Sequence, residues 1–436
     1  MKKELRNYLG RAFGGTFVVY GAGVALAFAS QVLLTRLLGA DQYGNYYFVL
    51  AWVMALLIVA KLGLDSALLR FVPAYLARQQ WGLLKGVLRW SASKAAWASL
   101  LSAGLLAVVV SSIPGIGSGL AQTFYLGCVV LLLLVYVYLR SALLRSLKHV
   151  VLALLPEAVI APLVLGVSIT LFWWLVDSDL NSVHAMAATL AGLIVSAFVG
   201  RLLLASRLPG QLQQAPALND SETWLRSTRS MMLIGGAHVL LNNTDSIMLG
   251  LLRDAHSVGV YAVAAKSAIL VSFPLTIANT TIAPLISRFH STDDHAQLQQ
   301  ALDHSMRLVS LASACVFLAV LLFGREFLSI FGPEFVEAYV ALVILSGGAL
   351  VNALAGPSAN LLSLTGSEGY VSRVMLTVTG LNIVLNLVFI PPWGIEGAAA
   401  ATAISMVAWN LLMFIMVRRR LGLQPNGMLG RFGVGR

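Results

Sequence analysis

About twelve stretches of the chain are apolar enough, each over roughly 20 residues, to cross a bilayer as helices. This pattern restricts the fold, because backbone N–H and C=O groups find no water in the hydrocarbon core and only helices and closed barrels satisfy them there. The predicted spans are 13–34, 46–64, 91–113, 120–139, 150–175, 184–204, 231–252, 258–285, 308–323, 336–362, 371–390 and 396–417. Apolar residues fill 58 % of the 436 positions and charged residues 11 %. The sequence therefore predicts an all-α, polytopic membrane protein.

One turn is used twice. The segment LTRLLGADQYGNYYF at residues 34–48 has a counterpart, LGLLRDAHSVGVYAV, 215 residues later. In both copies a Gly-x-Tyr pair opens the following span: Gly44 with Tyr46, and Gly259 with Tyr261. Glycine permits a tight reversal, and a tyrosine ring suits the boundary between water and lipid. We expect these residues to form a polar turn between two spans.

The longest internal polar interval divides the chain into two halves. It runs from 206 to 230, between the sixth and seventh spans. We expect an N-terminal lobe at 1–204, a cytoplasmic linker at 205–230, and a C-terminal lobe with a basic tail at 231–436. Because each half has six helices, both enter the membrane in the same orientation. A pseudo-two-fold axis along the membrane normal should relate them, as in many transporters.

The distribution of basic residues sets the predicted orientation. With the N-terminus inside, 24 Lys and Arg residues fall on inner segments, and only Arg36, Arg253 and Arg325 fall on outer turns. This asymmetry follows the positive-inside rule and predicts that both termini are cytoplasmic. The net charge of +11 then reflects membrane topology and gives no reason to expect nucleic acid as a partner.

Lys and Arg near span ends can snorkel to the membrane surface, but four charged residues lie deeper in predicted spans, where each costs roughly 2.5–3.5 kcal/mol on insertion scales. They are Lys61, Glu157, Asp245 and Lys266. Similar depths predict one acid–base couple in each half, with Lys61 facing Glu157 and Lys266 facing Asp245. Alternatively, Lys61 pairs with Asp65 one helical turn later.

A polar stripe marks the seventh span. His238, Asn242 and Asp245 share one helix face, and the eleventh span carries the pair Asn382 and Asn386. Such groups either hydrogen-bond between helices or line a wet lumen. The carboxylate could bind a coupling ion, H⁺ or Na⁺, and Glu157 in the fifth span is a second candidate for this role. Glu157 could instead be a partner of Arg145.

No other chemistry is predicted. Both cysteines, Cys128 and Cys315, fall in apolar spans, and the His and Asp residues between 290 and 304 match no zinc spacing. We expect no metal site and no organic cofactor. There is also no Walker loop or G-x-S-x-G motif, so ATP-driven or hydrolytic activity has no support.

Several segments resemble bacterial polysaccharide-repeat-unit flippases of the multidrug/oligosaccharidyl-lipid/polysaccharide exporter superfamily. They are TRLLGADQYGNYYF, GLDSALLRFVPAYLARQQWGLLKG from Gly63, DSIMLGLLRDAHSVGVYAVAAK from Asp245, and LNIVLNLVFIPPWGIEGAAAATAIS from Leu381. The resemblance implies a two-lobe bundle in the inner membrane. It would move an undecaprenyl-pyrophosphate-linked oligosaccharide by alternating access, in a membrane shared with a polysaccharide polymerase and chain-length machinery.

The resemblance also implies a cationic lumen that holds the anionic head group. The substrate-binding candidates in this sequence are Lys61, Lys266, Arg36, Arg70, Lys94, Asn382 and Asn386. The first span has no deep arginine of the kind seen in peptidoglycan-precursor flippases, since Arg11 lies at its start.

Three alternatives remain open. A multidrug and toxin antiporter shares the architecture, and Asp245 would suit a cationic substrate. A major-facilitator carrier also has six plus six helices, but the loop after the second span lacks the G-x-x-x-D-R-x-G-R-R pattern. A membrane-embedded polymerase or glycosyltransferase would need catalytic groups on a sizeable outer loop, and the outer segments here are short. We therefore expect a transporter and not an enzyme.

Overall fold

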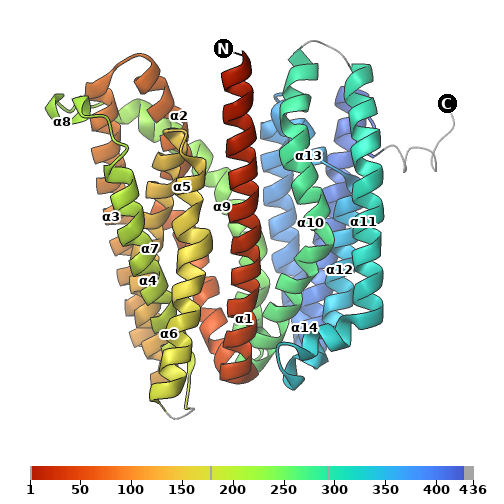
Figure 1. Ribbon diagram of the computed structural model, residues 1–436. Coiled ribbons are helices and arrows are strands. Elements are labelled where there is room, and N and C mark those ends of the chain that lie inside the picture. The colour runs from red at the N-terminus through yellow and green to blue at the C-terminus, as the bar shows by residue number, and fades with distance from the viewer. Residues whose placement is uncertain (1, 177–178, 292–294, 427–436) are drawn as a thin grey trace. The chain divides into compact units, whose positions relative to one another are not determined.

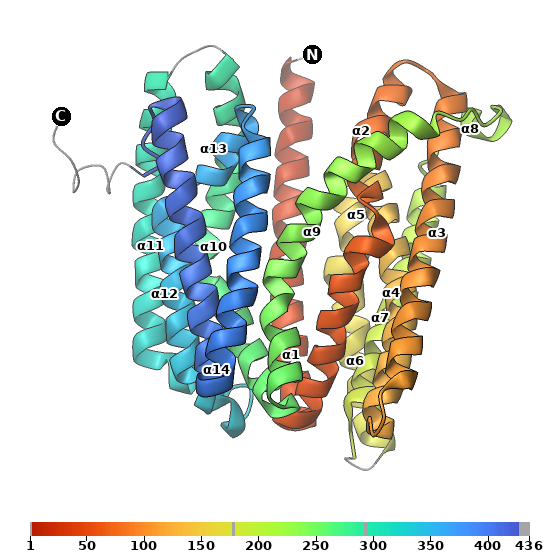
Figure 2. The ribbon, with the colours of Figure 1, turned by 180° about the vertical axis from the view of Figure 1, so that it is seen from behind.

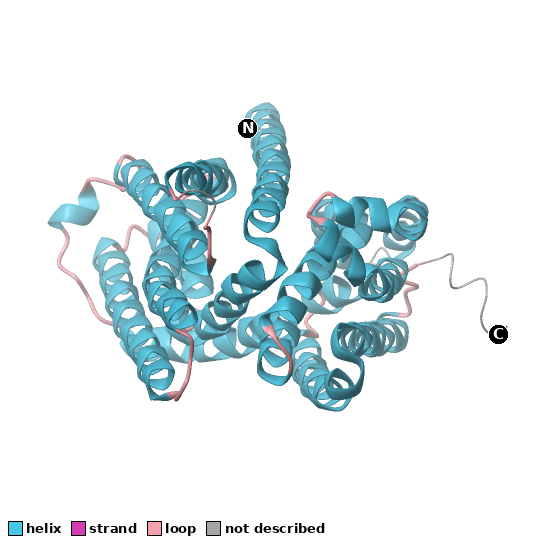
Figure 3. Cartoon of the chain, turned by 90° about the horizontal axis from the view of Figure 1, so that it is seen from below, coloured by secondary structure: helices cyan, strands magenta, loops and turns pink. Residues whose placement is uncertain are grey.

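The computed structural model describes residues 2–176, 179–291 and 295–426, and these ranges contain helices and no strand (Figure 1 and Figure 3). The chain forms two compact units, at residues 1–239 and 240–436. We describe each unit by itself.

The first unit contains eight α-helices and one π-helical turn, and α9 continues from it into the second unit. These elements are α1 (Lys2–Lys61), α2 (Leu64–Ala77), α3 (Trp81–Ser112), α4 (Ser118–Ser146), α5 (Val150–Leu155), the π-helix η1 (Pro156–Ile160), α6 (Ala161–Leu175), α7 (Ser182–Ala205), α8 (Gln211–Gln214) and α9 (Ser221–Leu252). Helix α2 carries apolar residues on one face, which packs on α3 and α4.

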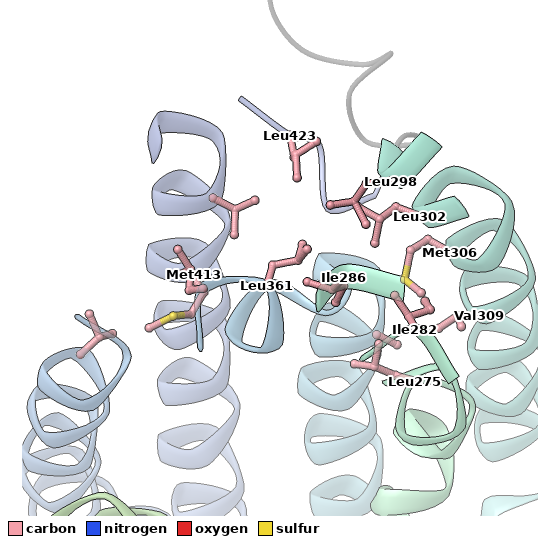
Figure 4. Packing of buried hydrophobic residues seen from close by; sticks show 14 of the residues in the cluster. Leu275, Ile282, Ile286, Leu298, Leu302, Met306, Val309, Leu361, Met413 and Leu423 are labelled. Carbon is pink, nitrogen blue, oxygen red and sulfur yellow. The ribbon is translucent and has the colours of Figure 1, made fainter. Parts of the chain in front are cut away.

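The second unit is built from long helices joined by short turns. Its elements are α10 (Ala255–Ser291), α11 (His295–Ser329), the 3₁₀ helix η2 (Pro333–Ala338), α12 (Tyr339–Ala355), α13 (Ser358–Leu364) and α14 (Glu368–Leu421). Its core lies among α10, α11, α12, α13 and α14, where Leu302, Met306 and Leu361 are fully buried (Figure 4). The segment after α14 joins this core through Leu423.

The prediction of about twelve transmembrane helices is confirmed for the described residues. Within the described residues, nine helices are long and apolar enough to cross a membrane. Two of them, α1 and α14, each consist of two helices that meet at a glycine, and α9 is a further helix of 32 residues. Figure 2 shows the chain reversing direction within α1.

The reversals occur at Gly39 and Gly394. Gly39 has φ 69° and ψ 174°, and Gly394 has φ 55° and ψ −125°. Only glycine adopts such angles at little cost, since it lacks a Cβ. The sequence prediction that Gly44 makes the first reversal is wrong: Gly44 is helical and buried. The break comes five residues earlier because Gly39 directly follows the apolar run, whereas Gly44 already lies on the packed face of the next helix.

The interval expected to be a linker packs onto the first unit. The backbone N–H of Leu218 donates to Gly82, and the Lys85 ammonium donates to the carbonyl of Ala215. Trp224, near the start of α9, is fully buried and its indole N–H donates to the Tyr75 hydroxyl. The two compact units therefore divide within α9, at Val239–Leu240, and not within residues 205–230.

Candidate functional site

A cluster of polar side chains lies in the second unit around Asp245 on α9. This carboxylate is 5 % exposed and accepts four hydrogen bonds from side chains. The Tyr261 hydroxyl of α10 donates at 2.6 Å, and the amides of Asn386 and Asn382 on α14 donate at 2.7 and 3.4 Å. The Thr402 hydroxyl, also on α14, is the fourth donor. A buried carboxylate needs this many donors to replace its lost hydration.

The shape of α14 brings these donors together. Asn382 and Asn386 are one turn apart on the first half of α14, so they share a face. Thr402 follows the break at Gly394, and the hairpin places its hydroxyl 3.3 Å from the Asn382 amide nitrogen. The sequence prediction included both asparagines but not Thr402, which is recognisable only as a polar residue in an alanine-rich span.

Arg253 stabilises this hairpin by hydrogen bonds to its backbone. Its guanidinium donates from Nε and Nη2 to the Ile390 carbonyl, at 3.2 and 3.1 Å, and from Nη2 to the Pro391 carbonyl. The helix breaks at Gly394, so the carbonyls of Ile390 and Pro391 lie in its last turn and are available as acceptors. Arg253 therefore joins the turn between α9 and α10 to the turn that positions Thr402.

The site gathers oxygen atoms suited to a small cation. Besides the carboxylate, it contains the Asn382 and Asn386 carbonyl oxygens and the two hydroxyls. Asn386 Oδ1 is buried and has no hydrogen-bond partner among the described residues. An uncompensated buried acceptor is costly, and a hard cation with oxygen ligands would satisfy it. The residues present therefore fit either a proton or an alkali cation.

The predicted partners of Asp245 differ from the observed ones. Lys266, half-buried on α10, is not one of its four donors, so hydroxyls and amides occupy the place that we assigned to the lysine. The side chains of His238 and Asn242 lie outside the described residues, and their role stays a prediction. The side chains at 290 and 293–295, among the histidines and aspartates for which no metal site was expected, also lie outside them.

The acid–base couple predicted for the first unit is wrong. Lys61 pairs with Asp65 at 2.7 Å, which is the alternative that the one-turn spacing allowed. Glu157, on η1, pairs instead with Arg140 of α4 at 3.3 Å. Our sequence boundary ended the fourth span at 139, whereas α4 continues to Ser146. Arg140 was therefore assigned to the inner loop, although it is only 2 % exposed inside the helix bundle.

The guanidinium of Arg140 is held in a pocket against α7. Its Nη1 donates to the Ser196 carbonyl of α7 at 2.7 Å. Gly200, one turn further along α7, leaves room for the guanidinium, because a Cβ there would lie 1.1 Å from Arg140 Nη1. The first unit thus holds its buried charge between α4, η1 and α7.

Tyr46 is buried in the first unit and not at the lipid boundary, so that prediction is wrong. It is 5 % exposed, and its hydroxyl lies 3.0 Å from the Thr189 hydroxyl of α7. Tyr261, its counterpart, is 2 % exposed and bonds Asp245. Tyr46 faces inward because the break at Gly39 moves the turn five residues away from Gly44, and Tyr261 lies inside α10, which begins at Ala255.

The remaining substrate candidates are exposed. Arg36, Arg70 and Lys94 all have exposed side chains, and Arg70 donates to the Ser227 hydroxyl of α9 at 3.2 Å. Their predicted contacts with a head group stay predictions.

Asp254, in the turn outside the spans, caps α10. Its carboxylate accepts from the Ser257 backbone N–H at 2.7 Å, which holds the pKa of Asp254 below its ordinary value. Asp254 stands where the other copy of the turn has Gly39.

Comparison with known proteins shows likeness to polysaccharide biosynthesis proteins and flippases. The family described as "Polysaccharide biosynthesis protein" matches residues 9–290, and the MatE family matches residues 233–391. The chain is 25 % identical over 240 residues to the probable low-salt glycan biosynthesis flippase Agl15 of Haloferax volcanii. This match covers 55 % of the chain and 50 % of Agl15, so the chain spans about half the length of that relative. Bacterial origin stays a prediction.

Solved structures show the same fold. An inward-facing multidrug resistance MATE family transporter of the MOP superfamily matches with a TM-score of 0.73 at 14 % identity, covering 93 % of this chain and 94 % of that one. The lipid II flippase MurJ in an inward closed conformation matches with a TM-score of 0.68 at 14 % identity, covering 92 % and 87 %. At these identities the likeness establishes the two-lobe helical fold. Because the first family model covers more than half of the sequence, the chain belongs to the polysaccharide biosynthesis protein family.

Proposed function

We propose that this protein is a flippase that moves a lipid-linked oligosaccharide between membrane leaflets by alternating access. The observation that carries the proposal is a polysaccharide biosynthesis family match on a chain with the fold of MOP superfamily transporters. A relative named as a probable glycan biosynthesis flippase supports it. The buried groups described above, an ion pair in the first unit and a hydrogen-bonded carboxylate in the second, suit a transporter.

The finer features of the proposal come from the sequence. The substrate carries an undecaprenyl-pyrophosphate anchor and travels from the cytoplasmic to the periplasmic leaflet of the inner membrane, with both termini cytoplasmic. Its phosphates are held by some of the cations at Lys61, Lys266, Arg36, Arg70 and Lys94. A polymerase and chain-length proteins then use the exported units.

Transport is coupled to an ion at Asp245. Binding of H⁺ or Na⁺ would neutralise the carboxylate and change its bonds to Tyr261 on α10 and Thr402 on α14. The occupancy of the site would then alter how α9 packs against both helices, which gives the ion different affinities for two conformations.

The coupling is tested with Asp245→Asn, which keeps the shape of the side chain and removes its charge. We expect transport in proteoliposomes to lose its response to imposed pH and Na⁺ gradients. Tyr46→Phe is the matched control in the first unit, and the response should persist there. An unchanged response to both gradients in Asp245→Asn would remove Asp245 from the coupling mechanism.

A deletion strain tests the transport function itself. We expect lipid-linked oligosaccharide to accumulate on the cytoplasmic leaflet and the intact gene to reverse this. Single units collecting on the outer leaflet would instead indicate a membrane-embedded polymerase or glycosyltransferase and contradict the flippase proposal.

The MatE family match to residues 233–391 favours a second candidate, a cation-coupled multidrug antiporter. The same strain distinguishes it. Unchanged oligosaccharide with increased sensitivity to cationic drugs would support the antiporter and contradict the flippase.

A further inference from the structure

A groove of about 560 Å³ runs along α3 and α4 in the first unit. These helices pack side by side, and α4 packs against α7 (Figure 2). Its walls are almost entirely apolar, with Leu88 and Leu100 on α3, Leu132 and Leu139 on α4, and Leu208 beyond the end of α7. The volume falls in the range of about 300–1,000 Å³ typical of sites for small molecules.

Small side chains on α3 give the groove its depth. Ala92, Ala95, Ala96 and Ser99 line it at helical spacing, whereas neighbouring positions of the same helix carry large residues such as Trp97. An apolar groove on a transmembrane helix pair suits a hydrocarbon chain.

Two hydrogen-bond donors interrupt this apolar wall. Arg140 and Ser91 both line the groove and are each 2 % exposed. Arg140 Nε and Ser91 Oγ have no hydrogen-bond partner among the described residues. The other two guanidinium nitrogens are engaged, Nη1 by the Ser196 carbonyl and Nη2 by Glu157. Both residues line the groove, so two donors without a partner among the described residues lie in its wall.

These donors require an occupant with acceptor oxygens as well as a hydrocarbon chain. Exposed cations lie next in sequence to residues that line the groove: Arg89 follows Leu88, Lys94 precedes Ala95, and Arg207 precedes Leu208. Basic residues at this end of the helices attract an anionic head group in the adjacent leaflet. The chemistry of the groove thus matches an anionic lipid more closely than a neutral one.

We propose that this groove binds one molecule of an anionic glycerophospholipid. One acyl chain lies along α3 and α4, and ester or phosphate oxygens accept hydrogen bonds from Arg140 Nε and Ser91 Oγ. The head group lies among Arg89, Lys94 and Arg207. The site is in the first unit only, so it is separate from the Asp245 site, and lipid binding to it does not depend on transport.

The proposal is tested by lipid binding to the purified full chain in uncharged detergent. Phosphatidylglycerol and phosphatidylcholine with identical acyl chains are added separately, and binding is followed by native mass spectrometry and thermal unfolding. We expect one phosphatidylglycerol to be retained per chain with a saturable rise in Tm, and affinity for phosphatidylcholine to be at least about tenfold weaker. Equal retention of both lipids would contradict an anionic site.

Two variants locate the binding. Ala96→Phe places a ring in the groove from an exposed position and should weaken phosphatidylglycerol binding by about tenfold or more. Gly104→Phe is the matched control on the same helix, since a Cβ there meets no atom within 4 Å. It should bind lipid as the parent does. Equal binding by both variants would overturn the proposal.

A milder variant and a competitor complete the test. Ser91→Ala removes one donor without filling space and should weaken binding a few-fold, so the proposal stays testable if Ala96→Phe fails to fold. Binding unchanged in Ser91→Ala would contradict the role of the donor pair. Displacement of phosphatidylglycerol by a polyprenyl phosphate at equal concentration would also overturn the proposal, because the groove would then belong to a transported lipid.

Discussion

The two units differ in the polar groups that their second and sixth transmembrane helices bring together. In the first, Tyr46 on the second transmembrane helix meets Thr189 on the sixth, and both groups are neutral hydroxyls. In the second, Tyr261 and Thr402 occupy the corresponding helices, but both donate to a carboxylate between them. Asp245 lies 215 residues after Ser30, the same interval that separates Tyr261 from Tyr46. Ser30 donates instead to the Pro162 carbonyl at 3.0 Å.

The difference shows what a buried charge demands of its surroundings. Replacing the serine position by an aspartate requires donors that the first unit does not supply. Val167 and Leu171 stand 215 residues before Asn382 and Asn386, the two amides that complete the shell of Asp245. The first unit keeps its buried charge elsewhere, where Arg140 and Glu157 neutralise each other. We therefore expect the carboxylate that a bound cation can neutralise to be in the second unit.

The largest effect is expected from Asp245→Leu, which leaves four buried donors without an acceptor. Each buried donor left unsatisfied costs roughly 1–3 kcal/mol, and four donors lose their shared acceptor here. Ser30→Leu is a matched change at the equivalent position in the other unit, and it removes one donor only. The comparison is checked by the yield of folded monomer and the Tm in detergent. Equal losses of yield and Tm for the two variants would show that the four donors around Asp245 do not stabilise the fold more than the single bond of Ser30.

The tyrosines at equivalent positions, Tyr261 and Tyr46, provide a second comparison of the two units. Tyr261→Phe removes a hydrogen bond to a charged group, worth about 1.5–3 kcal/mol, whereas Tyr46→Phe removes one between hydroxyls, worth about 0.5–1.5 kcal/mol. Tm values measured under identical conditions should fall further for Tyr261→Phe. The reverse order would contradict an ionised Asp245.

The two copies of the turn also differ, and Gly39→Ala tests this. The angles of Gly39 belong to a region that is nearly restricted to glycine, so alanine should cost about 1–3 kcal/mol. Asp254, at the equivalent position, caps a helix, and Asp254→Ala should cost about 0.5–2 kcal/mol. Thermal unfolding of both variants checks these values. A larger loss of stability in Gly44→Ala than in Gly39→Ala would contradict a reversal at Gly39.

The smallest effect is the pH dependence at Asp254. Because the Ser257 N–H lowers its folded-state pKa, this carboxylate stabilises the fold above its unfolded pKa of about 3.9. The contribution is lost as the pH falls through the lower folded value. Asp254→Asn should therefore flatten the dependence of Tm on pH below about 4. A parallel dependence in the variant and the parent would contradict the cap.

Individual residues show why part of the fold followed from the sequence. The spans around Cys128 and Cys315 were predicted correctly because apolar runs of this length can cross a bilayer only as helices. The site residues Asn382, Asn386 and Asp245 were found because polar groups are rare and costly in such runs. Arg140 was missed because helix ends extend beyond the apolar window, as α4 does.

The number of helices, their order and the polar groups that need partners followed from the sequence, because hydropathy and helical periodicity are local properties. The partners of these polar groups depend on the tertiary structure. Lys61 pairs with Asp65, and Glu157 pairs with Arg140. Asp245 accepts hydrogen bonds from residues 16 to 157 positions away. These pairings depend on helix breaks at glycines and on packing between distant segments. A shift of five residues in one turn moved Tyr46 from the expected membrane surface to the core.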